Sequence, residues 1–204
     1  MTLLFSTVNA ATESTNHSMV LKMNTFISML RGINVSGQKQ MRMAELKSMY
    51  ESLGLVNVQT YVQSGNVTFE SKKQDATKLT ELIEAHIQHT FGYTVPVFIR
   101  DADYFRRIIE SNPFSSKRNE DPARLHVTFL YSRPSGSKLR DLTTPAGETD
   151  EYSIGEAEIF LFCPNGYGRT KLSNNFFERK LGVPATTRNW KTVNALYEMA
   201  KATQ

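Results

Sequence analysis

The sequence contains little of the chemistry from which proteins build disulfides, metal clusters and membrane anchors. Cys163 is its one cysteine, which excludes an intrachain disulfide and a zinc site made of cysteines. His86 belongs to the apolar stripe of a predicted helix, His89 faces outward from it, and His126 has no partner at metal-ligand spacing. No apolar run approaches the roughly 18 to 20 residues of a membrane-spanning helix. We therefore expect a protein of the reducing cytoplasm that holds no metal or cofactor and enters no membrane.

What the sequence does contain is an uneven distribution of positive charge. The 204 residues carry a net charge of +4, and 40% of them are hydrophobic, as in an ordinary globular chain. Residues 164–204 contain seven Lys/Arg and two acidic residues, a net charge of +5. This asymmetry favours an anionic partner, such as a nucleic acid or a phosphorylated small molecule. Charged, solvated helix faces are the structural alternative.

The pattern of apolar residues divides the chain into four parts. Residues 1–22 have no basic stretch and only a short apolar patch, so we interpret them as a flexible leader before Met23, which is a possible true start. A weak targeting peptide is the alternative. Residues 23–101 and 122–204 each show the element order β-α-β-β-α-β, and the second part ends with an extra helix. Residues 102–121 form a helix and a polar linker between them.

Both parts predict the same fold class, an α+β fold made of two ferredoxin-like halves with antiparallel sheets. In this fold the strands have the spatial order 4-1-3-2 and two helices lie on one face. Only the order of elements links the halves, because their residues are not visibly repeated. The predicted strands cover 25–30, 58–62, 67–69, 95–99, 125–131, 151–154, 158–162 and 185–188. The predicted helices cover 43–53, 76–91, 104–111, 137–142, 172–181 and a last stretch from 193.

The predicted topology brings small and basic residues together at the edges of the sheets. The end of the first strand, Arg31 and Gly32, lies beside the turn Ser64–Asn66, because the first and third strands are neighbours. In the second half, Pro164–Arg169 lies beside Arg188–Trp190. The loop Leu30–Gly37, with its two glycines, can turn backbone N–H groups outward and suits an anion.

Four segments resemble the signature blocks of a widespread, mostly bacterial domain family of unknown function. They are Arg31–Val35 (RGINV), Thr60–Val67 (TYVQSGNV), Gly166–Leu172 (GYGRTKL) and Thr187–Val193 (TRNWKTV). The blocks occur in the family's order, and the resemblance spans the chain from Met23 to the C-terminus. The resemblance implies two α-β plait halves, in agreement with the predicted element order. It implies no activity, cofactor or catalytic residue.

The sequence does not fit the phosphate-binding loop known as the P-loop. Gly32 and Gly37 have nearly the spacing of a phosphate-binding P-loop, but Gln38 stands where that loop needs lysine, and Lys39 comes one place late. The antiparallel order is also wrong for a P-loop fold.

RNA-recognition modules of this topology stack bases on aromatic residues of strands one and three. Here Ser64 and Asn66 take the places of the third-strand aromatics, so Phe26 and Phe69 are interpreted as core residues rather than a stacking platform.

Several single residues have both a functional and a structural interpretation. Cys163 precedes a proline near basic residues and is a candidate nucleophile, although a lone cysteine is more often a small buried hydrophobe. Trp190 either packs between the halves or forms one wall of a ligand pocket. Glu156 and Glu158 flank a hairpin and are interpreted as solvated charges.

We predict a binding protein that holds a phosphate-bearing ligand, nucleic acid or nucleotide, in a groove between the halves. Arg31, Arg169, Lys171 and Arg188 would supply charge, and loop contacts are their structural alternative. An enzyme acting on a small phosphorylated or carboxylated metabolite in the same groove, through Cys163, Tyr167 or an unidentified acidic residue, is one alternative. A ligand-free scaffold is the other. The predicted ligand-binding residues are Arg31, Gly32, Asn34, Ser64, Gly65, Asn66, Gly168, Arg169, Lys171, Arg188, Asn189 and Trp190.

Overall fold

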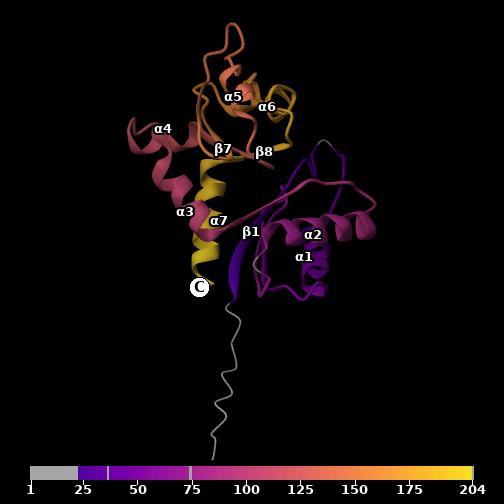
Figure 1. Cartoon of the computed structure of the whole chain (residues 1–204). Helices are drawn as coiled ribbons and strands as arrows, with labels where there is room; N and C mark the ends of the chain where they lie inside the picture. Colours follow the sequence, from indigo (N-terminus) through magenta and orange to yellow (C-terminus); the bar gives the residue numbers. More distant parts are fainter. Residues whose placement is uncertain (1–22, 36, 74, 204) are drawn as a thin grey trace, which may run out of the picture.

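The computed structural model describes residues 23–35, 37–73 and 75–203 of the chain. The leader that the sequence predicts over residues 1–22 lies outside these ranges. The described residues form two four-stranded antiparallel sheets with helices packed against them (Figure 1). No helix in this part of the chain is long and apolar enough to cross a membrane.

The first half of the molecule consists of one sheet and two helices. Its strand order is β2-β3-β1-β4, which is the predicted order 4-1-3-2. Every pair of neighbouring strands in it is antiparallel. Pro96 directly precedes β4, which is an edge strand, where the missing N–H of proline costs no ladder hydrogen bond. The elements are β1 Asn24–Leu30, α1 Met43–Ser52, β2 Val56–Tyr61, β3 Asn66–Ser71, α2 Ala76–Phe91 and β4 Val97–Asp101.

The second half repeats this plan with its own sheet and helices. Its strand order is β6-β7-β5-β8, again with the first and third strands of the half in the centre. The elements are β5 Leu125–Leu130, α5 Gly136–Arg140, β6 Glu151–Ile154, β7 Glu158–Phe162, α6 Asn174–Leu181 and β8 Ala185–Asn189. The α+β class and the two antiparallel halves are therefore as predicted.

The helix ends follow from local capping chemistry. The side chain of Asp75 accepts hydrogen bonds from two backbone N–H groups in the first turn of α2, and Gly92 ends that helix at a φ of 73°. Leu79, Ile83 and Ile87 lie one turn apart on its buried face. This stripe packs α2 against the first sheet, because the same residues belong to the core shared by α1, α2 and that sheet.

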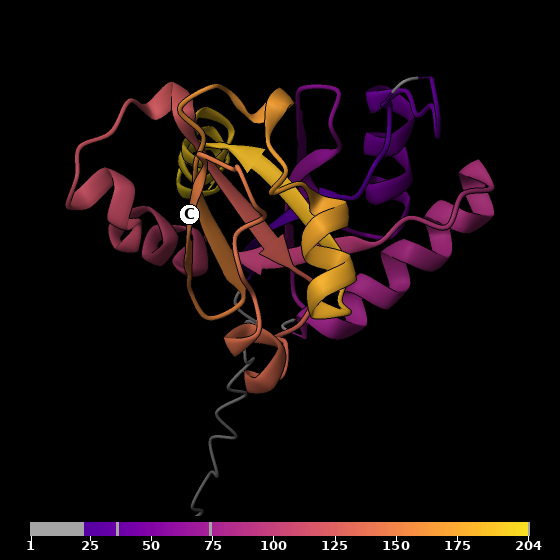
Figure 2. The same cartoon turned by 90° about the horizontal axis from the view of Figure 1, so that it is seen from above.

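Each half is followed by one further helix. α3 (Ala102–Ser111) follows β4, and α7 (Trp190–Lys201) follows β8. They pack against each other, between the two sheets, as Figures 1 and 2 show. The short α4 (Pro113–Ser116) and the turns η1 (Pro122–Arg124) and η2 (Tyr167–Arg169) complete the described elements.

The largest contribution to the junction of the halves is a shared apolar core. The side chains of Ile27 and Phe98 project from the first sheet, on the face opposite α1 and α2. Those of Phe129 and Phe160 project from the second sheet into the same core. All four meet the buried faces of α3 and α7. A third core lies on the outer side of the second sheet, under α6. The two sheets are thus held in one body by apolar burial on both sides of the α3 and α7 layer.

Candidate functional site

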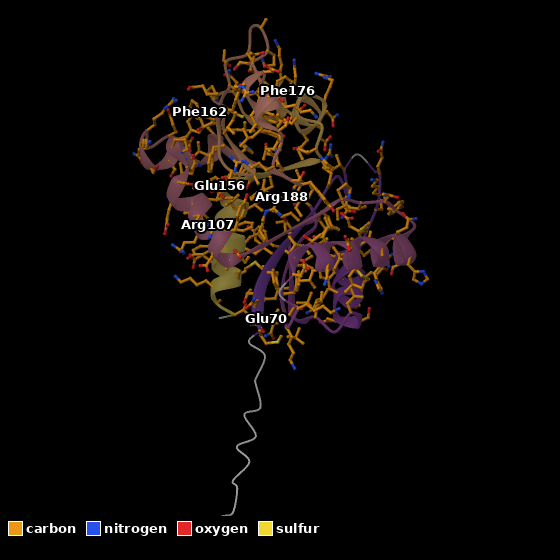
Figure 3. All side chains as sticks on the ribbon, viewed as in Figure 1. Glu70, Arg107, Glu156, Phe162, Phe176 and Arg188 are labelled. Atoms are coloured by element: carbon orange, nitrogen blue, oxygen red, sulfur yellow. The ribbon has the colours of Figure 1, made fainter. Side chains whose placement is uncertain are left out.

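Some of the predicted site residues meet at the junction of the two halves, and Arg188 connects the halves there (Figure 3). From β8 its guanidinium crosses into the first half. Nε donates to Oδ1 of Asn66, and Nη2 donates to the carbonyl oxygens of Leu30 and Ser64 at 2.9 and 3.0 Å. Nη1 donates to two acceptors on β8 itself. All five N–H groups of this guanidinium therefore have protein acceptors.

Burial defines the role of Arg188. The residue is only 7% exposed. Burial and the nearby positive charge of Arg31 lower its pKa to about 10, against an opposing effect of Tyr167, so it stays charged at neutral pH. Arg188 was predicted to supply charge to a ligand. The structure instead places it as a charged connection inside the protein, because its partners satisfy it completely.

Asn66 and Ser64 are likewise part of the junction. Asn66 is fully buried, and its Nδ2 donates to the carbonyl of Tyr61 and to the hydroxyl of Ser64, both at 3.0 Å. Since its Oδ1 accepts from Arg188, the amide is satisfied on both sides. The predicted hydrogen bonds from Asn66 to a ligand are therefore replaced by bonds within the molecule.

Arg31 forms a second polar connection between the halves. Its Nε and Nη2 donate to the two carboxylate oxygens of Glu178 on α6, each at 3.0 Å, and Nη2 also donates to Asn175 at 2.9 Å. The Glu178 side chain is 27% exposed. Its partial burial raises the pKa of this carboxyl, but hydrogen bonds from Arg31 and from the Ala185 N–H, with the Arg31 charge, bring the net pKa below its ordinary value. Arg31 thus stabilises the junction.

The loop after β1 is organised by Asn34. This residue adopts a φ of 55°, a left-handed conformation that asparagine tolerates better than most residues. Its Nδ2 donates to the carbonyls of Met41 and Gln63, and its Oδ1 accepts from the Met41 N–H. Gly65 lies in the turn between β2 and β3 and packs directly against Leu30. Asn34 and Gly65 therefore close the loop onto the turn.

Two more predicted residues begin α7. The side chain of Asn189 caps the helix by accepting a hydrogen bond from the Thr192 N–H at 2.8 Å. Trp190 is 7% exposed and belongs to the central core between the sheets. Of its two interpretations, packing between the halves is the one that the structure shows.

The remaining predicted residues lie on the outside of the molecule. Gly32, at a φ of 68°, has no neighbour within 4 Å of where a Cβ would stand. Gly168, Arg169 and Lys171 lie exposed in the loop between β7 and α6. The Nζ of Lys171 donates to the carbonyl of Ala146 at 2.8 Å, so its charge is partly engaged there.

Three exposed basic residues stand on segments that meet at one edge of the second sheet. The end of β7, the start of β5 and the end of β8 meet here, since the Cys163 N–H donates to the carbonyl of Arg124 and His126 pairs with Asn189. The guanidinium of Arg124 lies against the β7–α6 loop, 3.5 Å from where a Cβ on Gly166 would stand. We define the basic edge as Arg124, Arg169 and Lys191. All three are exposed, and none takes part in an ion pair within the described chain.

The predicted ligand-binding residues included neither Arg124 nor Lys191, and the sequence analysis did not connect Arg124 with this edge. The signal that could have found it is its position immediately before the strand at 125–130, the central strand of the second half. A residue at that end of the central strand lies beside the ends of both neighbouring strands.

The single cysteine lies next to this edge but is buried. Cys163 has no exposed surface, and burial together with the carboxylate of Asp150 raises the pKa of its thiol to about 12. At neutral pH the group is a thiol and not a thiolate, so it is a poor nucleophile. His126 stacks on Tyr167 with ring centres 4.7 Å apart, and burial lowers the pKa of its imidazole below the ordinary value. Within the described residues, no three His, Cys, Asp or Glu side chains are placed to hold a metal ion.

Comparisons with known proteins agree with this fold. The sequence model of a family described as "Protein of unknown function (DUF1697)" matches residues 23–160. That range includes the blocks at 31–35 and 60–67, whereas the blocks at 166–172 and 187–193 lie beyond its end. A comparison with curated proteins found no match. Among solved structures, the chain resembles the conserved bacterial protein SP0830 from Streptococcus pneumoniae, with 25% identity and a TM-score of 0.68 over 88% of this chain and 99% of that chain.

Proposed function

The chain belongs to the DUF1697 family of proteins of unknown function, and we propose that it is a binding protein for a phosphate-bearing ligand, nucleic acid or nucleotide, held at the basic edge. One observation carries this proposal. Arg124, Arg169 and Lys191 come from three distant segments to one edge of the second sheet, exposed and without ion-pair partners in the described chain. Phosphate groups are bound by such unpaired guanidinium and ammonium groups.

We place the binding site at the basic edge and not in the groove that the sequence predicted between the halves. Arg31 and Arg188 connect the halves, so their guanidinium groups are already occupied. Arg169 keeps its predicted role, and Lys171 contributes charge beside it. Exposed basic residues on separate segments of the edge suit a backbone of phosphates better than an enclosed small molecule.

Salt dependence of binding tests the proposal directly. We would measure the affinity of labelled single-stranded and double-stranded oligonucleotides by fluorescence anisotropy between about 50 and 300 mM KCl. Affinity should fall linearly with salt on a logarithmic plot, and each of Arg124→Ala, Arg169→Ala and Lys191→Ala should reduce the slope by about 1. Lys72→Ala, at an exposed position in the first half, is the matched control and should keep the wild-type slope.

Thermal unfolding with mononucleotides distinguishes a nucleotide ligand from a nucleic acid. Thermal stabilisation by mononucleotides but not by oligonucleotides would assign the edge to a small ligand, through binding linkage. Absence of salt-sensitive binding to every nucleic acid, together with no stabilisation by nucleotides, would overturn the proposal.

A ligand-free scaffold is the second candidate, and one observation favours it. Arg188 and Trp190 fill the junction where the groove was predicted. A scaffold predicts that no oligonucleotide, nucleotide or metabolite stabilises the protein. An enzyme acting on a phosphorylated or carboxylated metabolite instead predicts stabilisation by one class of metabolite.

A further inference from the structure

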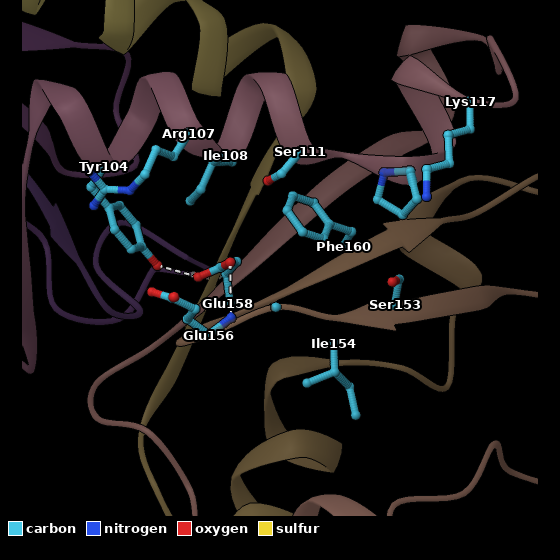
Figure 4. A pocket seen from close by; sticks show the side chains of 12 residues that line it. Tyr104, Arg107, Ile108, Ser111, Lys117, Ser153, Ile154, Glu156, Glu158 and Phe160 are labelled. Atoms are coloured by element: carbon cyan, nitrogen blue, oxygen red, sulfur yellow. Dashed lines mark hydrogen bonds between the residues drawn. The ribbon is translucent and has the colours of Figure 1, made fainter.

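A pocket of about 420 Å³ lies between α3, the α3–α4 connection and the β6–β7 hairpin, away from the basic edge (Figure 4). One wall comes from the helices that follow the first half, and the other comes from the sheet of the second half. Ile108 and Phe160 form an apolar floor, with Pro113 beside them. The volume is within the range of small-molecule sites, which is about 300 to 1,000 Å³. None of the residues of the basic edge lines this pocket.

The buried acidic group of this pocket is already compensated. Glu158 is 6% exposed, and its carboxylate accepts hydrogen bonds from the Tyr104 hydroxyl at 2.6 Å and from the backbone N–H groups of Glu156 and Ala157. The guanidinium groups of Arg100 and Arg107 lie over the Tyr104 ring, 5.2 and 5.8 Å from its centre. Arg107, which also lines the pocket, lies over the same ring whose hydroxyl donates to Glu158, so these two opposite charges of the lining offset each other.

Two opposite charges of the lining remain. Glu156 and Lys117 are exposed, and neither takes part in an ion pair among the residues that the structure describes. Figure 4 shows them on opposite sides of the pocket, with Phe160 between them. The hydroxyls of Ser111 and Ser153 add neutral hydrogen-bonding groups along this length. The pocket therefore has a negative end, an apolar middle and a positive end.

We propose that this pocket binds a small zwitterion of short-peptide size, with its ammonium group at Glu156, its carboxylate at Lys117 and its apolar side chains on Ile108 and Phe160. A molecule that carried only an anion would leave Glu156 unpaired near it, and a cation alone would leave Lys117 unpaired. A zwitterion with separated charges satisfies both ends at once. The apolar floor then takes up the side chains, whose burial supplies binding free energy.

Chemically blocked peptides test this assignment. The probe is a pool of unmodified dipeptides of Val, Leu and Phe, followed by titration calorimetry with its tightest member. The same dipeptide with an acetylated amine, or with an amidated carboxylate, should bind the wild-type protein about two- to fivefold more weakly, as expected when one partner of an exposed ion pair is lost. Glu156→Gln should remove the discrimination against acetylation alone. Lys117→Met should remove the discrimination against amidation alone.

The variants also provide the controls. Both replaced side chains are exposed, so the fold is expected to survive, and a denaturant unfolding curve of each variant checks this. Lys72→Met removes a positive charge from an exposed site in the first half and should leave both discriminations unchanged. The proposal is overturned if no dipeptide of the pool binds, or if blocked and unmodified peptides bind the wild-type protein equally.

Discussion

Arg100 and Arg188 occupy equivalent positions in the two halves, and each donates a hydrogen bond to the carbonyl that ends the first strand of the other half. Nη2 of Arg100 on β4 donates to the Leu130 oxygen at 2.7 Å, and Nη2 of Arg188 on β8 donates to the Leu30 oxygen at 2.9 Å. Each arginine precedes the residue that caps the following helix. The junction is therefore built from two reciprocal connections.

Other pairs share this equivalence. Glu84 on α2 accepts a hydrogen bond from the first N–H of β4, and Glu178 on α6 accepts one from the first N–H of β8, at 2.8 and 2.9 Å. Asp101 caps α3 as Asn189 caps α7. The sequence indicated only a common order of elements, and this interpretation was too narrow. The halves share individual hydrogen bonds as well, in residues of the same or similar chemistry.

Arg188 should contribute far more to stability than its counterpart. We expect Arg188→Met to reduce the free energy of unfolding by about 3 to 5 kcal/mol, because three acceptors of the first half, two of them buried, lose this donor. Arg100→Met should cost about 1 kcal/mol, since Arg100 is half-buried and bonds one carbonyl of the other half. Urea unfolding measures both values. Equal costs would show that burial at Arg188 has no special energetic role.

Two glycines with the same backbone conformation should differ in their tolerance of a side chain. Gly32 and Gly65 have φ values of 68° and 72°. A Cβ on Gly65 would stand 2.7 Å from a methyl carbon of Ile33 and 2.8 Å from Leu30, whereas one on Gly32 has open space. We expect Gly32→Ala to cost about 1 kcal/mol, the conformational cost alone, and Gly65→Ala about 3 kcal/mol or more. Thermal unfolding of the two variants, compared side by side, tests this difference.

The ion pair between Arg31 and Glu178 should make the free energy of unfolding depend on pH in the acidic range. The folded-state pKa of Glu178 lies below its ordinary value of 4.5, so the carboxylate contributes stability that is fully present above pH 4.5. That contribution is lost as the pH falls through the lower, folded-state pKa. In Arg31→Met the cost at pH 7 should be about 1 kcal/mol, as for a partly exposed pair, and it should shrink as the pH falls below 4.5. Unfolding curves across this range check the sign, and a pH-independent cost would contradict it.

Cys163 should be unreactive in the folded protein. Its thiol is buried and its pKa is raised to about 12, so both access and thiolate formation oppose modification. We expect Ellman's reagent to react at pH 8 at least about 100-fold more slowly than with the chain unfolded in guanidinium chloride. Reaction at the unfolded rate without denaturant would show that the thiol is accessible.

Local chemistry explains where sequence prediction succeeded and where it was slightly wrong. The helix predicted over 76–91 has these bounds in the structure, because its start depends on the nearby side chain of Asp75, which caps it. The helix expected from residue 172 begins instead at Asn174, because Ser173 caps it by accepting a hydrogen bond from the Phe176 N–H. Errors of one or two residues at element ends are typical when competing caps stand side by side.

The sequence by itself determined the order of elements and the strand order of both sheets. Only the tertiary structure decided which charges face solvent. The acceptors of Arg188 in the first half lie between 122 and 158 positions earlier in the chain, so no local pattern marked this arginine as internal and Arg169 as exposed. Spacing along the chain encodes a strand or a helix because it acts between near neighbours. The environment of a charge depends on distant segments that meet only when the sheets pack.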